Sequence, residues 1–324
     1  MGPFHDGPIY MRRNFRSLLT AFLGVFALTS LGLAADASRT PATAETIITV
    51  KPTHKGADVK PLASNDVLAY AGKNRTQVTS LEPLKGNLAS LQLFIFLDDS
   101  TRSGVLGTQL PELKKFVRSL PASTQVAIGY MRNGGYDLVQ GFTTEHDNAA
   151  NSLRLPTSTP GINGSPYFAL SYLVKHWPSK ETTGRRAVLM LTDGVDRYYD
   201  NGSTNDPYVD AAVKDSQHFG VLVYSIYLRG EGLYSANSWG VNMAQSRLDQ
   251  VSKATGGEAY TEGLMSPVSL APYLKQVSDR LDNQYRIAFV ASKDSGLQSV
   301  QFRTEVPGVK IIAPEQVRIK QDRS

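Results

Sequence analysis

A run of seven residues, "LQLFIFL" at 91–97, constrains the fold more than any other stretch of the chain. It carries apolar residues at both odd and even positions, so both faces of the resulting strand would be apolar. Such a strand is typical of the centre of a parallel sheet that helices cover on both sides. Two further stretches, "RRAVLMLTDG" at 185–194 and "VLVYSIYLRG" at 221–230, have the same character. The sequence therefore predicts several buried parallel strands.

Helical patterns alternate with these strands. Residues 107–120, "GTQLPELKKFVRSL", place Leu110, Leu113, Phe116, Val117 and Leu120 on one stripe, and Pro111 fits a first helical turn. Ser165 followed by Pro166 is typical of a helix N-terminus. Further helices are expected within 206–220, 241–257 and 266–284, and a hairpin is expected around Gly134–Gly135. The alternation predicts an α/β fold with a doubly wound, mostly parallel sheet.

The two ends of the chain differ from this central part. Residues 1–35 combine Arg12, Arg13 and Arg16 with the apolar stretch "LLTAFLGVFALTSLGLAA", which indicates a signal peptide or an N-terminal anchor. We therefore expect an extracytoplasmic protein, periplasmic or secreted, with a membrane tether only if this segment stays uncleaved. The remaining boundaries are expected as a tether at 36–46, a small β unit at 47–87, the α/β domain at 88–284 and a C-terminal β extension at 285–324. We expect that extension to pack with the N-terminal β unit.

Composition excludes several kinds of chemistry. The chain has no cysteine, which rules out disulfides, thiolate metal sites and a cysteine nucleophile. Its formal net charge is +5, and no basic run follows the N-terminal segment, so nucleic acid is not expected as a partner. The five histidines are widely dispersed and form no zinc-binding pattern.

Carboxylates stand at the ends of two expected central strands. Asp98 and Asp99 follow the first strand directly, and Asp193 directly follows the strand expected at 185–192. In doubly wound sheets, ligands bind at the carboxyl ends of the strands, near the point where the strand order reverses. We therefore expect these carboxylates to belong to one functional site.

The residues at these strand ends resemble the von Willebrand factor type A domain, and more closely the exported bacterial proteins called VWFA-related, over roughly residues 45–320. The first two positions of the family's Asp-x-Ser-x-Ser motif match Asp98 and Ser100, and "LMLTDG" matches its last aspartate with Asp193. The resemblance implies a metal-ion-dependent adhesion site that holds Mg²⁺ or another divalent cation and binds a protein or other macromolecule. Oxygen ligands of this kind suit such a cation.

The match departs from the family in two places. Arg102 stands where the second serine belongs, and the loop "TPGINGSPYFAL" offers only Asn163 or Ser165 in place of a threonine. A second register, Asp99, Thr101 and Ser103, would restore both hydroxyls, but a shift of one residue reverses the side-chain direction in a strand. In the first register, the guanidinium of Arg102 could lie near the two aspartates and replace the metal ion.

The loops expected beside this site are rich in aromatic residues. "DRYYDNGSTNDPY" follows Asp193, and "RGEGLYSANSWG" follows the next strand. Aromatic rings among small polar residues are typical of recognition surfaces. We expect a binding rim that consists of Arg102, Tyr198, Tyr199, Tyr234 and Trp239.

The most direct interpretation is an exported binding module with a degenerate adhesion site. Two alternatives stay open. One is a Mg²⁺-dependent hydrolase of the phosphoaspartate type that uses Asp98 or Asp99, although Ser100 occupies the position of its second aspartate. The other is a structural envelope protein in which the metal site has decayed.

Overall fold

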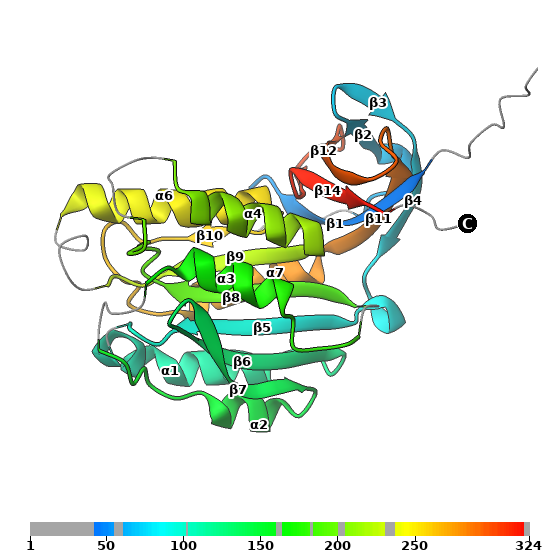
Figure 1. The fold of residues 1–324 in the computed structure, drawn as a ribbon. Coiled ribbons are helices and arrows are strands. Elements are labelled where there is room, and N and C mark those ends of the chain that lie inside the picture. The colour runs from blue at the N-terminus through cyan, green and yellow to red at the C-terminus, as the bar shows by residue number, and fades with distance from the viewer. Residues whose placement is uncertain are drawn as a thin grey trace, which may run out of the picture. The chain divides into compact units, whose positions relative to one another are not determined.

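The central feature of the computed structural model is a six-stranded sheet with the order β10-β9-β8-β5-β6-β7 (Figure 1). All strands are parallel except β7, which pairs antiparallel with β6. The structure describes residues 42–54, 61–101, 103–159, 164–181, 184–199, 205–230 and 237–320, all within one compact unit, Pro41–Ser324. The strands are β5 (Leu91–Asp98), β6 (Thr124–Arg132), β7 (Gly135–Thr143), β8 (Arg185–Thr192), β9 (Val221–Tyr227) and β10 (Ala259–Tyr260).

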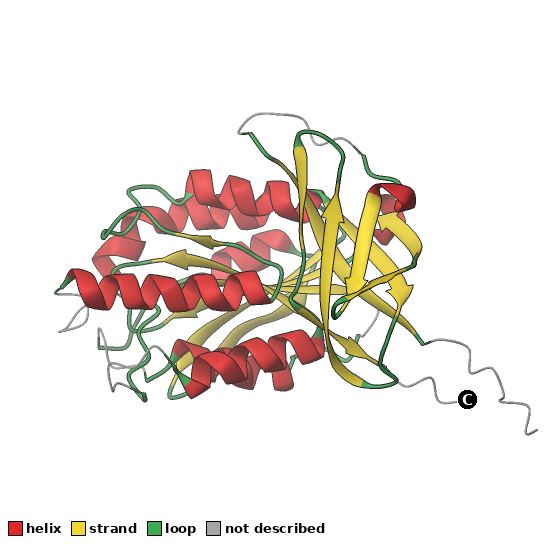
Figure 2. Ribbon diagram, turned by 90° about the horizontal axis from the view of Figure 1, so that it is seen from above, coloured by secondary structure: helices red, strands yellow, loops and turns green. Residues whose placement is uncertain are grey.

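Helices cover both faces of this sheet, as Figure 2 shows from above. One face packs against α1 (Ser103–Arg118), α2 (His146–Ser152) and α7 (Ala271–Asp282), and the other against α3 (Pro166–Lys175), α4 (Pro207–Phe219) and α6 (Ser238–Ala254). Strand β5 explains why both faces are apolar: Leu93 and Ile95 belong to the first core, whereas Phe94 belongs to the second. The predicted doubly wound α/β fold is confirmed.

Two local predictions need correction. Pro111 lies in the interior of α1 rather than in its first turn, because the helix begins eight residues earlier, at Ser103. The turn between β6 and β7 is formed by Asn133 and Gly134 rather than by Gly134 and Gly135. Both turn residues have positive φ, 50° and 74°, which is the conformation of the two-residue turns that match the twist of a hairpin.

The N-terminal and C-terminal segments together form two further four-stranded sheets, with the orders β13-β1-β11-β4 and β14-β12-β2-β3. We call this part the sandwich. Its strands are β1 (Thr43–Pro52), β2 (Val67–Ala71), β3 (Asn74–Thr76), β4 (Val78–Pro83), β11 (Gln284–Val290), β12 (Gly296–Thr304), β13 (Val309–Ile312) and β14 (Gln316–Ile319), with short 3-10 helices η1 (Ser64–Asp66) and η2 (Gly86–Leu88).

Pairing in the sandwich confirms that the C-terminal tail packs with the N-terminal β unit. Strand β1 pairs with β11 from Thr43↔Val290 to Thr49↔Gln284, and apolar side chains of both sheets share one core. The expected tether at 36–46 is therefore too long at its C-terminal end, because residues 43–46 are already hydrogen-bonded in β1. Residues 1–35, the expected signal peptide or anchor, lie outside the described residues.

Polar contacts join the sandwich to the α/β part. The carboxylate of Glu258 accepts from Lys51 Nζ of β1 and from Arg280 Nε of α7, both at 2.7 Å. Arg185, the first residue of β8, donates to the carbonyl oxygen of Leu281 at 2.6 Å and to Gln284 Oε1 at 2.5 Å. Among the described helices, none is both long enough and apolar enough to cross a membrane.

We predict that Glu258→Gln lowers the free energy of unfolding at pH 7 by about 2 kcal/mol, because it removes the carboxylate that Lys51 and Arg280 share. Burial acts to raise the pKa of Glu258, but the hydrogen bonds from Lys51 and Arg280 outweigh it and the pKa is lowered from 4.5. This stabilisation is therefore present above pH 4.5 and is lost as the pH falls through the lower folded-state pKa.

Denaturant unfolding of the wild type and the variant at pH 7 and in acid tests this prediction. The exposed Glu305→Gln is the matched control, and its effect should stay within about 0.5 kcal/mol at both pH values. A Glu258→Gln deficit that persisted unchanged in acid would contradict the predicted role of this carboxylate.

Candidate binding site at the carboxyl edge of the sheet

The order of the central sheet reverses between β5 and β8. The chain runs from β5 to β6 on one side and from β8 to β9 on the other, so the carboxyl ends of β5 and β8 flank the switch point. Asp98 is the last residue of β5, and Asp193 follows Thr192 at the end of β8. The fold therefore places two of the sequence-predicted carboxylates where a ligand site is expected.

The carboxylate of Asp98 is buried and accepts hydrogen bonds from described residues. Its Oδ1 accepts from the backbone N of Ser100 at 2.9 Å and from Ser100 Oγ at 2.8 Å. Its Oδ2 accepts from Thr192 Oγ1 at 3.0 Å, which joins the ends of β5 and β8. Asp98 and Ser100 are thus brought together as the sequence predicts. Thr192 was missed, although it stands in the "TDG" stretch that was used to assign Asp193.

The carboxylate of Asp193 pairs with the guanidinium of Arg197. Arg197 Nη2 lies 2.6 Å from Asp193 Oδ2 and Nη1 lies 3.4 Å from Oδ1, while the backbone N of Val195 donates to Oδ1 at 3.0 Å. Burial raises the pKa of Asp193, and the nearby Asp98 raises it further, against the lowering effect of Arg197. The same carboxylates raise the pKa of Arg197 despite its burial.

A guanidinium, that of Arg197, therefore neutralises Asp193, and Arg102, the arginine expected at this site, lies outside the described residues. The spacing in "DGVDR", with arginine four residues after Asp193, was the signal for it. Gly230, at the end of the next strand's loop, closes the site from another side. A Cβ at this position would lie 1.9 Å from Asp193 Oδ2, so only glycine fits there without a shift.

The residues of the second register, Asp99, Thr101 and Ser103, do not make the contacts that Asp98 and Ser100 make. Asp99 is fully buried and accepts from Arg154 Nη1 at 2.7 Å, from Ser158 Oγ at 2.8 Å and from the N and Oγ1 of Thr157. Burial acts to raise the pKa of Asp99, but the hydrogen bonds from Arg154 and Ser158 outweigh it and the pKa is lowered. Asp99 thus fixes the loop that follows α2. Thr101 is buried with its hydroxyl unpaired among the described residues, and the side chain of Ser103 is not described.

Ser165, a candidate for the missing loop threonine, has two structural contacts. Its Oγ accepts from the backbone N of Phe168 at 3.1 Å as the N-cap of α3, and it donates to Asp196 Oδ2 at 2.7 Å. Asp196 Oδ1 in turn accepts from the backbone N of Tyr198 and of Tyr199. Burial raises the pKa of Asp196, partly offset by the bond from Ser165. This pair ties α3 to the loop after β8, and Asn163 lies outside the described residues.

A second buried ion pair lies beneath this loop. Asp206 caps α4 through the backbone N of Tyr208 and Val209, and its Oδ2 lies 3.2 Å from Arg247 Nη2 of α6. The hydroxyl of Tyr167 on α3 donates to the carbonyl oxygen of Gly194 at 2.8 Å. Side chains from three helices therefore hold the loop that carries Asp193 and Arg197. Sequence reasoning missed Asp196 and Arg247.

The rim of the site carries exposed aromatic rings. Tyr198 is 48% exposed, stands edge-on against Phe168 and Tyr208, and covers Gly164, where a Cβ would lie within 2 Å of the ring. Trp239, in the first turn of α6, is 52% exposed. Tyr199 is half-buried and Tyr234 lies outside the described residues. Tyr198 and Trp239 are thus exposed on segments that follow β8 and β9, and their role in a binding rim stays a prediction.

The arrangement does not fit a divalent cation as long as Arg197 keeps its position. Such an ion would take ligands from Asp98, Ser100 and Asp193, yet Asp193 already binds the guanidinium through both oxygens. A second cation beside Arg197 would be repelled by it. Within the described residues, no group of three or more His, Cys, Asp or Glu side chains could hold a metal ion.

No protein-family model matches this sequence, and no curated protein sequence matches it. Solved structures similar to it include an aerotolerance-related membrane protein from Bacteroides fragilis with multiple mutations to serine, at 14% identity and TM-score 0.43 over 60% of this chain and 99% of that chain. The conserved hypothetical protein BatB from Bacteroides thetaiotaomicron matches at 13% and 0.41 over 59% and 97%. The SpRpn10 VWA domain matches at 10% and 0.39 over 58% and 95%.

At these identities the likeness concerns the fold alone. The strand order of this chain and the helices on both faces of its sheet form a von Willebrand factor A-like fold, as the resemblance in sequence predicts.

We predict that Arg197→Met lowers the free energy of unfolding at pH 7 by about 3 kcal/mol, because it removes the guanidinium that pairs with the buried carboxylate of Asp193. An acid whose folded-state pKa is raised loses stability as the pH rises through that pKa. The deficit should therefore be smaller at pH 5 than at pH 7, because a lower pH favours the neutral form of Asp193.

Denaturant unfolding at the two pH values measures this effect. Arg132→Met, which breaks an exposed ion pair with Asp137, is the matched control and should cost about 0.5 kcal/mol or less. If the Arg197→Met deficit did not change with pH, Asp193 would not be the group that the mutation leaves uncompensated.

Proposed function

We propose that this chain is a von Willebrand factor A-type binding module. In this proposal it recognises a protein partner outside the cytoplasm, through the carboxyl edge of its sheet, without a divalent cation. The observation that carries the proposal is the ion pair of Arg197 and Asp193 at the switch point, since the guanidinium provides the charge that a metal ion would otherwise bring. Arg197 is a positioning residue here: it holds the loop after β8, and that loop presents the rim.

Exposed apolar side chains around this edge support a protein partner. Eleven large apolar side chains are exposed in the described part of the chain, and six of them lie on loops or first helical turns at this edge: Leu155, Phe168, Tyr198, Trp239, Leu264 and Met265. Aromatic residues and methionine are enriched at protein interfaces, and a few such anchors supply most of the binding energy. Catalysis would need a general base near Asp98, and hydroxyl and guanidinium groups surround the described carboxylates instead.

Export stands as part of the proposal and rests on the sequence of residues 1–35.

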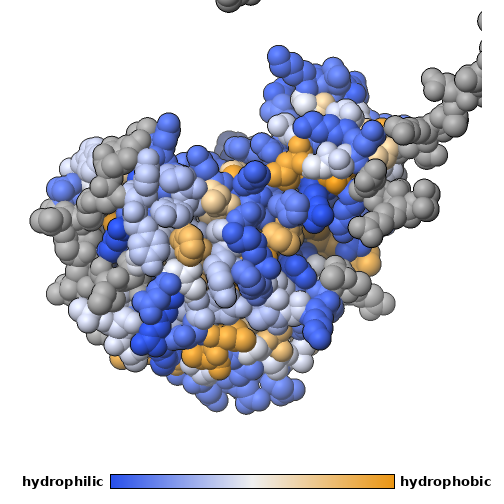
Figure 3. Space-filling view, viewed as in Figure 1, coloured by the Kyte–Doolittle hydropathy of each residue, from blue (hydrophilic) through white to orange (hydrophobic). Residues whose placement is uncertain are grey.

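Two exposed features compete as the docking surface. One is the rim, and the other is an apolar patch over the edge strand β7, where Leu138 and Val139 are exposed (Figure 3). The rim is favoured because buried ion pairs fix the loop beneath it, so little ordering of the loop is required on binding.

We predict that the wild-type protein shows no saturable binding of Mg²⁺ or Mn²⁺ in isothermal titration calorimetry, and that a chelator leaves its unfolding temperature unchanged. The reason is that Arg197 already satisfies the charge of Asp193. A saturable heat of metal binding that disappears in Asp193→Asn would mean that an ion displaces the guanidinium, and it would overturn the metal-free form of the proposal.

We predict that the full chain, used as bait on an extract of its source cells, captures a specific protein in the presence of a chelator, and that Tyr198→Ser/Trp239→Ser abolishes this capture. Both rings are about half exposed, so neither change should affect folding. Leu138→Ser/Val139→Ser on β7 is the matched control and should capture as the wild type does. Loss of capture in the control and retention in the rim variant would place the docking surface on β7.

A further inference from the structure

A cavity of about 460 Å³ lies at the opposite edge of the central sheet from the candidate site. It is formed where the amino ends of β8 and β9 and the last turn of α4 face strands β1 and β14 of the sandwich. Its volume is within the range of small-molecule sites. Nothing proposed above for the carboxyl edge makes use of it.

Positive charge dominates the lining of this cavity. Arg185, Arg286, Arg318 and Lys320 line it against a single carboxylate, Glu45, among the described residues. None of the four cationic side chains forms an ion pair with a carboxylate in the described part of the chain. Four cations that share one cavity with a single carboxylate repel one another, so a bound anion would reduce this repulsion.

Arg185 is an independent sign of a missing partner. It is 8% exposed, and its Nη atoms donate only to uncharged oxygens, those of Leu281, Gln284 and Ala89. Its buried Nε has no hydrogen-bond partner among the described residues. Burial lowers the pKa of Arg185, and the opposing effects of Tyr224 and Asp282 do not offset the loss of water. A buried guanidinium with a free N–H donor is costly unless something in the cavity compensates it.

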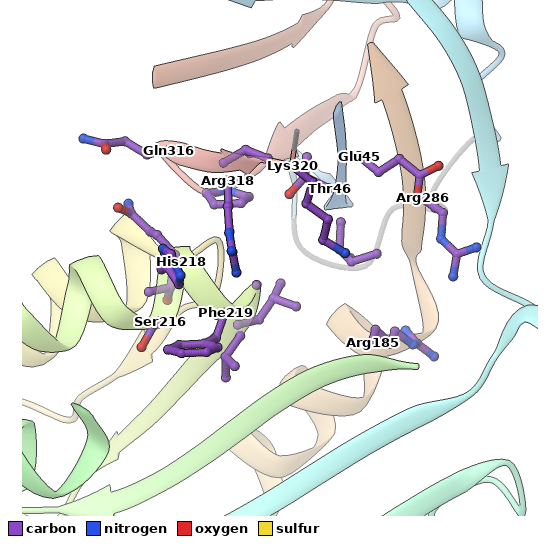
Figure 4. Close-up of a pocket in the computed structure, with 18 of the residues that line it drawn as sticks. Glu45, Thr46, Arg185, Ser216, His218, Phe219, Arg286, Gln316, Arg318 and Lys320 are labelled. Atoms are coloured by element: carbon purple, nitrogen blue, oxygen red, sulfur yellow. The ribbon is translucent and has the colours of Figure 1, made fainter. Parts of the chain in front are cut away.

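The rest of the wall is largely apolar. It includes Ile47, Phe219, Val221, Leu222, Pro314 and Val317. In Figure 4, Arg318 and Lys320 extend from the end of β14 into the cavity toward the turn that carries Phe219, whereas Gln316 points away. The cavity therefore presents cationic groups and an apolar wall to the same ligand.

We infer that this cavity is a binding site for an organic phosphate, whose phosphoryl group meets Arg318 and Lys320 and whose apolar body packs against Phe219 and Val317. Arginine and lysine are the side chains that bind phosphate, and a dianion matches the excess of positive charge better than a carboxylate does. The apolar wall distinguishes such a ligand from a free inorganic anion, which would leave most of the cavity unfilled.

Calorimetric titration of the full chain with phenyl phosphate tests this inference, with inorganic phosphate and phenol as the two halves of that probe. The expected result is saturable 1:1 binding of phenyl phosphate, about ten-fold or more tighter than either half, that weakens as salt is added. Arg318→Gln/Lys320→Gln should weaken it by about ten-fold or more. Both side chains are exposed, so the variant keeps the packed core.

Arg75→Gln/Lys310→Gln removes the same charge from exposed positions of the sandwich outside the cavity and is the matched control. If both double variants bound phenyl phosphate equally weakly, the effect would depend on net charge alone, and the inference would be overturned. Absence of saturable binding to the wild type would overturn it too, as would inorganic phosphate binding as tightly as phenyl phosphate. The result is independent of partner capture at the rim, because the two sites share no residue.

Discussion

The ion pair between Arg197 and Asp193 is the interaction on which the carboxyl edge of this molecule depends. Five aspartates are buried there among the described residues, and each unpaired charge would cost several kcal/mol of folding free energy (Asp98, Asp99, Asp193, Asp196 and Asp206). The guanidiniums of Arg154, Arg197 and Arg247 offset part of this charge, and hydrogen bonds from hydroxyl and backbone groups hold the rest. The loop after β8 is consequently fixed by charge balance and not by apolar packing alone.

This balance also positions the helices that carry the rim. Asp196 accepts a hydrogen bond from the hydroxyl of Ser165 at the start of α3. Asp206 caps α4 and also pairs with Arg247 of α6. Each acid is therefore shared between the loop or helix that carries it and another element. Phe168 and Trp239 stand in the first turns of α3 and α6, so their exposure follows from the same contacts that neutralise the acids. A metal ion would add little rigidity to a loop that is already tied on three sides.

The sequence was sufficient to predict the strands and helices that follow a regular pattern of apolar residues. Apolar residues on both faces of β5 required helices on both sides of the sheet, and that requirement led to Asp98 and Asp193 at the switch point. It was insufficient to predict which arginine side chain pairs with a buried aspartate. Arg197 stands four residues after Asp193, and periodicity does not show that its guanidinium reaches that carboxylate. Pro111 was assigned to a first turn because proline is favoured there, whereas α1 begins at Ser103.

The two proposed sites lie at opposite ends of the same strand, and their separation has a physical consequence. Arg185 begins β8 and Asp193 follows its end, which at about 3.3 Å per residue puts their backbones about 26 Å apart. Over that distance two unit charges interact by only about 0.6 kcal/mol at an effective dielectric constant of about 20. Anion binding at one edge can therefore change affinity at the other only by moving β8 itself. The seven consecutive pairs that β8 makes with each of β5 and β9 oppose such a movement. The sheet thus acts as a rigid spacer, and we expect the two proposed sites to bind their ligands independently.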